Sequence, residues 1–122
     1  MITAEEWQLL SFFEAEPKLL DPAEPWCFND AAYKTADGTV ELSFAVAPSY
    51  SDVRIILSQN GRTLYELNAM GVHDVVYTNE SGAEQLVVQI NAGDWLVLSV
   101  KPRIFIRHEA QETERGRLNR GS

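Results

Sequence analysis

Hydrophobic and polar residues alternate along most of the chain beyond residue 26, with the period of two that is typical of half-buried β-strands. Leu42, Phe44 and Val46 alternate with small or polar neighbours, and the same alternation returns at residues 85–91. Turn residues separate these segments at short intervals. The pattern therefore predicts strands at about residues 26–35, 39–47, 52–59, 62–68, 72–78, 85–91, 94–100 and 103–108.

The turn sequences indicate how neighbouring strands are connected. The dipeptides between the segments are Asp37-Gly38, Asn60-Gly61, Ser81-Gly82 and Gly93-Asp94. Asp-Gly and Asn-Gly suit the type I′ turn, whose positive φ angles match the right-handed twist of paired strands. Because a parallel crossover needs a dozen or more residues, such short connections favour antiparallel neighbours.

The first residues follow a helical period instead. Thr3 and Glu6 have the spacing of a capping box at a helix N-terminus. Leu9, Leu10 and Phe13 fall on one arc of a helix that we expect to run from about residue 4 to about residue 16, before Pro17 ends the pattern. Trp7 on the flank of this arc, and Trp95 in a later strand, are expected in the core.

Together these elements predict an α+β fold that is mainly β. The N-terminal helix should pack on an antiparallel β-meander or a small barrel. We expect residues 1–110 to form a single domain and residues 111–122 to form a flexible basic tail, because the last dozen residues lack alternation and contain Leu118 as the only large apolar side chain. A chain of 122 residues is the size of one domain.

The amino-acid composition is typical of a globular protein. Hydrophobic residues make up 45% of the chain, which is enough for a core. Cys27 is the single cysteine, so an intramolecular disulfide and a multi-cysteine metal site are excluded. Apolar runs are far shorter than the roughly 20 residues that span a bilayer, and no basic segment leads into an apolar run near Met1. We expect a cytoplasmic protein without a membrane partner.

Charge is distributed unevenly. Residues 1–50 hold nine acidic and two basic side chains, a net of −7, residues 51–100 carry −4, and residues 101–122 carry +3. A body this acidic repels nucleic acid, which needs Lys and Arg to displace counterions from phosphates. The same charge attracts a basic protein, although an acidic surface also serves solubility alone.

No residue pattern supports catalysis or a cofactor. His73 and His108 have no second histidine or cysteine at metal-ligand spacing. Cys27 lies between Trp26 and Phe28, and no cationic neighbour in the sequence activates it, so we expect a buried structural thiol. We predict that the protein is not an enzyme and holds no metal.

Two features favour binding to another protein. Asp21, Glu24 and Asp30 occupy a segment that Pro22 and Pro25 stiffen, so that it loses less entropy when it is bound. A solvated connector between helix and sheet explains the same residues. Tyr33 and Tyr50 fall at strand ends or turns, and exposed tyrosines are favoured in interfaces.

In overall character the chain resembles the small acidic immunity proteins of bacterial polymorphic-toxin and contact-dependent inhibition systems. The features that carry this resemblance are the acidic charge, the single capped helix and the hairpin-rich sheet. The resemblance implies an inhibitor that binds and neutralises a cognate toxin, commonly a basic nuclease, by placing carboxylates in its active-site cleft. Opposite charges would also speed the encounter of the two proteins.

Two other hypotheses remain open at this point: an acidic secretion-chaperone-like protein, and a small β-barrel domain that binds a ligand in an internal cavity. For the immunity hypothesis, the candidate partner-binding residues are the acidic and tyrosine side chains of the first fifty residues: Glu14, Glu16, Asp21, Glu24, Asp30, Tyr33, Asp37 and Tyr50.

Overall fold

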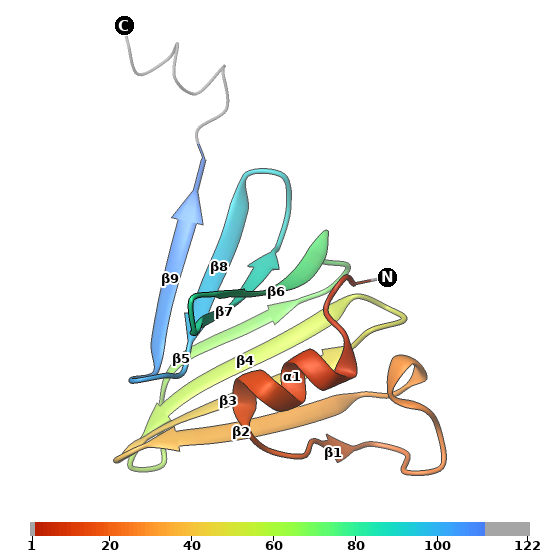
Figure 1. Ribbon diagram of the computed structural model, residues 1–122, viewed down its shortest axis with the longest axis horizontal. Coiled ribbons are helices and arrows are strands. Elements are labelled where there is room, and N and C mark those ends of the chain that lie inside the picture. Colours follow the sequence, from red (N-terminus) through yellow and green to blue (C-terminus); the bar gives the residue numbers. More distant parts are fainter. Residues whose placement is uncertain (1, 112–122) are drawn as a thin grey trace, which may run out of the picture.

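A computed structural model describes residues 2–111 and contains one α-helix, one short 3₁₀ helix and nine strands within them (Figure 1). In chain order the elements are α1 (Glu6–Phe13), β1 (Lys18–Leu19), η1 (Trp26–Phe28), β2 (Ala31–Asp37), β3 (Val40–Ala47), β4 (Asp52–Gln59), β5 (Arg62–Ala69), β6 (Asp74–Glu80), β7 (Ala83–Gln89), β8 (Asp94–Ser99) and β9 (Phe105–Ala110). The predicted α+β, mainly β fold is confirmed.

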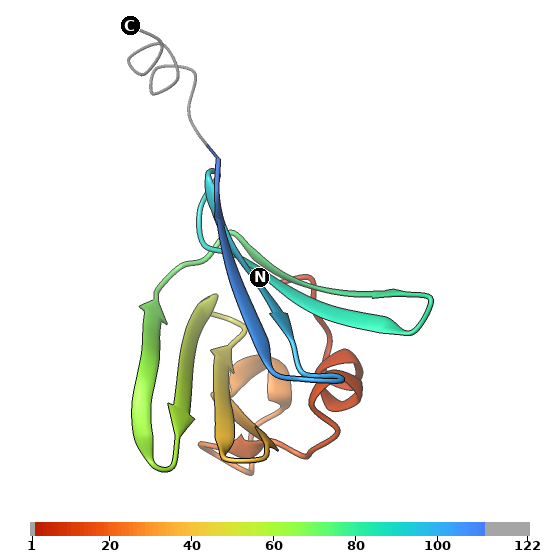
Figure 2. The same ribbon diagram turned by 90° about the vertical axis from the view of Figure 1, so that its left-hand side faces the viewer.

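The strands form two antiparallel sheets rather than one meander. Strands β1 to β5 make a five-stranded sheet and β6 to β9 a four-stranded sheet, each in chain order. Figure 2 shows the second sheet crossing over the first, with α1 between β2 and the β6–β7 hairpin. The sheets do not close on each other in the described residues, so the barrel alternative is wrong.

The chain changes sheet at residues 70–73. The amide of Gly71, which has a positive φ of 63°, donates to the Asp52 carboxylate at 3.0 Å. The amide of Val72 then bonds back to Ser51, whereas the amide of His73 bonds to Gln89 in the other sheet. Because these bonds direct the chain away from β5, β6 starts a new sheet instead of pairing with its sequence neighbour.

The core lies between the two sheets and under α1. Tyr33, Phe44 and Ile55 are neighbours in register across β2, β3 and β4, and all three are fully buried. From the helix, Phe13 stacks on Tyr33 with ring centroids 5.1 Å apart and lies 5.5 Å from the Phe44 ring. Burial of such large side chains supplies most of the energy that holds the helix in place.

The helix is shorter than the sequence predicts. It begins after Glu5, which forms the capping box with Gln8, and it ends at Phe13, because Glu14 adopts a left-handed conformation with a φ of 52°. Thr3 does not cap the helix; its amide and hydroxyl both donate to Asp74 in β6. The helix buries the face that carries Leu9, Phe12 and Phe13, and Trp7 lies on the opposite face and is 60% exposed, which corrects its predicted place in the core.

The predicted strand at residues 26–35 is partly wrong. Trp26 to Phe28 form η1, and the strand begins only at Ala31. The amides of Phe28 and Asn29 bond back to the carbonyls of Pro25 and Trp26, which closes the 3₁₀ turn in place of strand pairing. Cys27 therefore lies in η1 and is half-buried, not a core thiol.

The hairpin turns follow the sequence closely. Asn60-Gly61 and Ser81-Gly82 each have two positive φ angles, as a type I′ turn requires. Asp37 instead pairs with Val40 at the strand end, so the loop there is Gly38-Thr39.

No helix in residues 2–111 is long and apolar enough to cross a bilayer. The predicted basic tail falls almost entirely on residues 112–122, outside the described part, and the domain boundary at 110 stays a prediction.

Candidate functional site

One end of the molecule carries two hollows separated by η1 and the β3–β4 turn. The first, which we call the tryptophan hollow, has a volume of about 480 Å³ and is lined by Ile2, Thr3, Ala4, Glu5, Glu6, Trp7, Trp26, Cys27 and Pro48. The second, the tyrosine hollow, has about 230 Å³ and is lined by Leu20, Phe28, Asn29, Asp30, Ala47, Tyr50, Asp52 and Arg54. We call these residues, with Asp21, Glu24 and Met70, the η1 end.

Asn29 organises the loop that forms this end. Its side chain is the only polar or charged one that is buried among the described residues. Its amide oxygen accepts hydrogen bonds from the backbone amides of Asp21 and Asp30, and its amide nitrogen donates to the carbonyls of Asp21 and Glu24. Because four hydrogen bonds converge on one buried side chain, the acidic loop around residues 21–30 is held in a fixed shape.

Large apolar side chains at the η1 end are strongly exposed. Leu20 is 80%, Tyr50 75% and Met70 83% exposed, and Phe28 on η1 is also mostly exposed. Met70 lies beside Asp52 and Arg54 in an adjoining depression. Exposed apolar side chains that gather on one surface, rather than scatter singly, are typical of interaction sites.

An ion pair lies among these apolar residues. A terminal nitrogen of Arg54, in β4, is 2.8 Å from both carboxylate oxygens of Asp30, which precedes β2. The arginine side chain is half exposed. The η1 end thus holds six carboxylates, those of Glu5, Glu6, Asp21, Glu24, Asp30 and Asp52, against the single guanidinium of Arg54. Its net charge is negative, Arg54 is already paired with Asp30, and Lys18 borders this end beside Leu20 and Arg54.

The structure brings together four of the eight predicted partner-binding residues. Asp21, Glu24, Asp30 and Tyr50 all lie at the η1 end. Glu16 lies outside it, beside Lys18 and Lys34 at the edge of the first sheet. These positions do not test whether any of the residues binds a partner.

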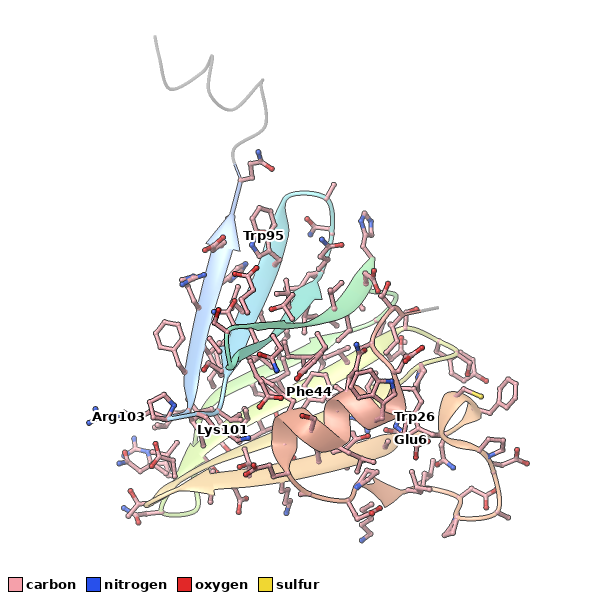
Figure 3. All side chains as sticks on the ribbon, in the orientation of Figure 1. Glu6, Trp26, Phe44, Trp95, Lys101 and Arg103 are labelled. Atoms are coloured by element: carbon pink, nitrogen blue, oxygen red, sulfur yellow. The ribbon has the colours of Figure 1, made fainter. Side chains whose placement is uncertain are left out.

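Glu14 and Asp37 lie at the other end of the molecule. The Glu14 carboxylate is 2.7 Å from the Lys101 ammonium, and the Asp37 carboxylate accepts a hydrogen bond from the Ile104 amide at 3.4 Å. Figure 3 shows Lys101 and Arg103 at this end, far from Trp26 and Glu6. Both acids are thus bound to the β8–β9 connection, although they belong to the same acidic half of the sequence as Asp21.

Tyr33 corrects the expectation of an exposed tyrosine. It lies inside β2, on the face that Phe13 covers, and is fully buried. Its hydroxyl accepts a hydrogen bond from the indole nitrogen of Trp26 at 2.9 Å. Burial raises the pKa of Tyr33 to about 12 despite that bond, and the carboxylates of Glu6 and Glu16 add to the rise. Tyr33 supports the η1 end from beneath but does not form its surface.

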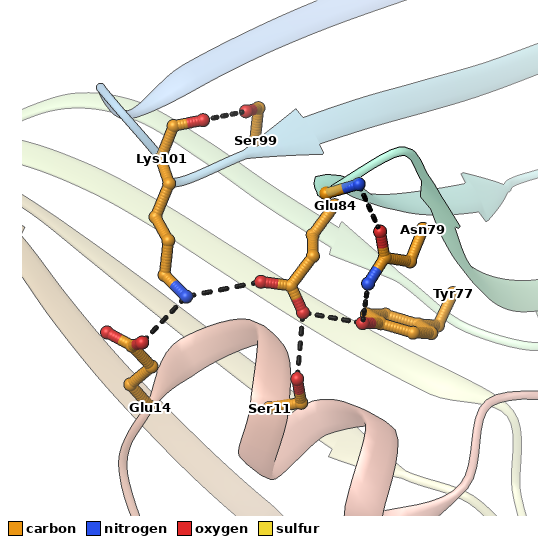
Figure 4. Close-up of polar contacts among 8 residues, drawn as sticks. Ser11, Glu14, Tyr77, Asn79, Glu84, Ser99 and Lys101 are labelled. Carbon is orange, nitrogen blue, oxygen red and sulfur yellow. Dashed lines mark hydrogen bonds and ion pairs between the residues drawn. The ribbon is translucent and has the colours of Figure 1, made fainter.

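A second polar cluster joins the helix to the second sheet (Figure 4). The Glu84 carboxylate accepts hydrogen bonds from the Tyr77 hydroxyl at 2.5 Å and the Ser11 hydroxyl at 2.8 Å, and lies 3.2 Å from the Lys101 ammonium. Lys101 also pairs with Glu14. Each of these side chains forms a hydrogen bond or an ion pair with another, so the cluster connects α1, β6, β7 and the β8–β9 connection. We call this cluster of Ser11, Glu14, Tyr77, Glu84 and Lys101 the brace.

The charges of this cluster stabilise one another. Partial burial opposes ionisation of Glu84, but hydrogen bonds from Tyr77, Ser11 and Lys101 outweigh it, so the pKa of Glu84 lies below its ordinary value. Hydrogen bonds to Glu14 and Glu84 in turn raise the pKa of Lys101. Both groups are therefore held in their charged forms.

The two histidines do not lie together in a common site. His108 lies 3.4 Å from Asp94, and His73 is exposed. Within residues 2–111, no group of three or more His, Cys, Asp or Glu side chains is placed to hold a metal ion.

Sequence reasoning misses most of the η1 end, because only four of its residues, Asp21, Glu24, Asp30 and Tyr50, are predicted to bind a partner. The alternation gives no binding role to Leu20, Phe28 and Met70, and the helical period places Trp7 in the core. A usable signal was present at Leu20 and Met70, because each is a large apolar residue directly beside a turn sequence and outside the alternation of the adjoining strand.

Comparison with known proteins finds a solved structure that shares this fold. No protein-family model matches the sequence, and no curated protein matches it either. Among solved structures, the chain is similar to one chain of a contact-dependent growth inhibition toxin–immunity protein complex from Klebsiella pneumoniae 342, with a TM-score of 0.72 and 16% sequence identity. The match covers 87% of this chain and 93% of that one. The two chains share a fold across nearly their whole lengths, so the predicted resemblance to a protein of a contact-dependent inhibition system is confirmed at the level of the fold.

Proposed function

We propose that this protein is an immunity protein that binds and neutralises the toxin of a contact-dependent inhibition system, without catalysing a reaction itself. The single observation that carries the proposal is the shared fold with a chain of a toxin–immunity complex. The acidic net charge of the sequence and the apolar, acidic η1 end are consistent with the same function.

The partner that best suits the η1 end is a basic toxin domain, such as a nuclease that acts in the cytoplasm. Carboxylates around the hollows would lie where such an enzyme binds substrate phosphates, and opposite charges speed association. Tyr50, Phe28 and Leu20 supply the apolar contact that a stable interface needs at its centre. Arg54, fixed by Asp30, would set the register of the partner against this surface.

The direct test uses the toxin domain encoded beside this protein's gene. Cells that produce the toxin domain should survive when they also produce the protein, and the two purified proteins should form a stable complex. If the protein neither protects cells nor binds the neighbouring gene product, the proposed function is wrong.

A matched pair of variants locates the interface in the same assay. Tyr50→Ala should weaken binding by about tenfold or more, since alanine changes at the centre of an interface often cost 1.4 kcal/mol or above. Phe105→Ala is the control, because Phe105 is another exposed aromatic side chain but lies on β9 in the other sheet. Equal effects of the two changes would argue against the η1 end.

A further inference from the structure

The tryptophan hollow combines two aromatic side chains with two carboxylates. Trp7 and Glu6 come from the first turn of α1, Glu5 caps that helix, and Trp26 comes from η1. Figure 3 shows Glu6 and Trp26 beside each other at this end of the molecule. The volume of about 480 Å³ falls within the range of sites that bind small organic groups.

Both indoles are held by hydrogen bonds. The Trp7 indole nitrogen donates to the Glu5 carboxylate at 2.5 Å, and the ring meets the edge of Tyr77 with centroids 6.4 Å apart. The Trp26 indole nitrogen donates to Tyr33. Because each ring is fixed by its polar edge, an occupant of the hollow need not order it, which lowers the entropic cost of binding.

The carboxylates differ in what they already bind. Glu5 accepts bonds from the Trp7 indole and from the backbone of the helix. Glu6 forms no ion pair and no side-chain hydrogen bond with any residue that the structure describes, and it is exposed. No basic side chain lines the hollow. Glu6 is therefore the carboxylate with capacity for an incoming cation.

The partial positive charge at the N-terminus of α1 does not cancel the preference of the hollow for a cation. The N-terminal end of α1 contributes a partial positive charge of roughly half an elementary charge. Two ionised carboxylates outweigh it. Tryptophan is also the aromatic side chain that attracts cations most strongly over its face.

We propose that the tryptophan hollow binds a basic side chain, arginine or lysine, that a protein partner inserts between Trp7 and Trp26 against Glu6. The identity of that partner as a toxin rests on the proposed function, whereas the preference of the hollow for a cationic group does not. The hollow would then act as an anchor site next to the apolar contact of the tyrosine hollow.

The test uses small probes, so that no toxin is needed. The protein is labelled with ¹⁵N, and the three indole N–H signals of Trp7, Trp26 and Trp95 are followed by NMR during titration with Nα-acetyl-arginine amide. Nα-acetyl-citrulline amide is the neutral control of the same shape. Trp95 is an internal control, because its indole nitrogen bonds to Glu109 in the second sheet.

The signals of Trp7 and Trp26 should shift in a saturable manner with the arginine probe, while Trp95 stays unchanged. The citrulline probe should bind about five- to tenfold more weakly, as expected for loss of a cation–π contact and its charge. Glu6→Gln should weaken the arginine probe by a similar factor, and Glu80→Gln on the distant β6–β7 hairpin should have no effect.

Three results would overturn the proposal: no saturable shift, equal binding of both probes, or unchanged binding by Glu6→Gln. The outcome is separate from that of the proposed function. If the hollow binds the arginine probe but the protein neutralises no toxin, the cation site is supported. Only the identification of its partner as a toxin is then wrong.

Discussion

The indole nitrogen of Trp26 donates a hydrogen bond to the hydroxyl of the buried Tyr33, with 2.9 Å between nitrogen and oxygen. Trp26 lines the tryptophan hollow, and Tyr33 lies under Phe13 in the core. This bond therefore connects the candidate binding surface to the best-packed part of the molecule. The η1 end is shaped before any partner arrives, which favours fast and tight association.

Tyr33→Phe tests this connection. The change leaves the half-buried Trp26 indole without its acceptor, and we expect the free energy of unfolding to fall by about 1–2 kcal/mol. Urea denaturation followed by tryptophan fluorescence measures it. Tyr50→Phe is the control, because the Tyr50 side chain is exposed and removal of its hydroxyl should change stability little.

The same variant has a predicted pH signature. The pKa of Tyr33 is raised to about 12 from an unfolded value of 10.0, chiefly by burial, so ionisation is disfavoured in the folded state. The stability that this supplies is fully present below pH 10 and is lost as pH rises toward 12. Wild-type protein should lose stability in that window more steeply than Tyr33→Phe. Parallel curves for the two proteins would contradict the assignment.

Glu84→Gln tests the brace between α1 and the second sheet. Because the folded pKa of Glu84 lies below its ordinary value of 4.5, the carboxylate contributes stability above that pH and loses it as the pH falls through the folded pKa. At pH 7 we expect a loss of roughly 1–2 kcal/mol, the cost of weakening charge-assisted hydrogen bonds. The difference from wild type should shrink as the pH falls below 4.5 and through the lowered pKa of the folded state.

Denaturation at pH 7 and at pH 3.5 separates these expectations. Glu80→Gln, an exposed acid at the end of β6 in the same hairpin, is the matched control and should resemble wild type at both values. A Glu84→Gln penalty that is equally large in acid would mean that shape, not charge, holds the brace.

Charge reversal tests how the η1 end meets a basic partner. Asp21→Lys combined with Glu24→Lys changes two exposed acids of that end. The pair Glu66→Lys and Glu80→Lys makes the same change in net charge elsewhere. With the proposed toxin partner, stopped-flow mixing at low salt should show association slowed about tenfold by the first pair and less by the second.

Wild-type association should also slow as ionic strength rises, because screening shortens the reach of the charges. If both pairs slow association equally, only the overall charge matters and the η1 end has no special role. Circular dichroism checks that each variant is folded, since the Asp21 carboxylate also accepts a hydrogen bond from the Ala23 amide.

Much of the fold follows from local pattern. The strand at Asp52–Gln59 has the predicted bounds, and Asn60-Gly61 forms the predicted turn, because alternation and positive φ depend on residues that are neighbours in sequence. The change of sheet after Ala69 depends on hydrogen bonds to Ser51 and Gln89, which are far away in the chain. No period in the sequence encodes those bonds.

The candidate site was predictable only in part, for the same reason. Asp21, Glu24 and Asp30 are close in sequence, and the hydrogen bonds of Asn29 hold them in one loop, whereas their role in binding stays a prediction. Glu14 is also close in sequence to Asp21 but faces Lys101, because the segment between them, which contains β1, carries the chain back toward the η1 end. Tyr33 alternates with exposed Lys34, and its burial depends on pairing with Phe44 and on the helix above it, neither of which is encoded in the sequence of β2 alone.

Hydrogen–deuterium exchange of the protein with and without the proposed toxin partner tests the central claim most directly. The account predicts that binding slows exchange at residues 20–30 and 47–54, which form the η1 end, and at residues 2–7 along the tryptophan hollow. Exchange in β9 should be unchanged. Protection confined to β6 and β9 of the second sheet, with none around η1, would contradict it.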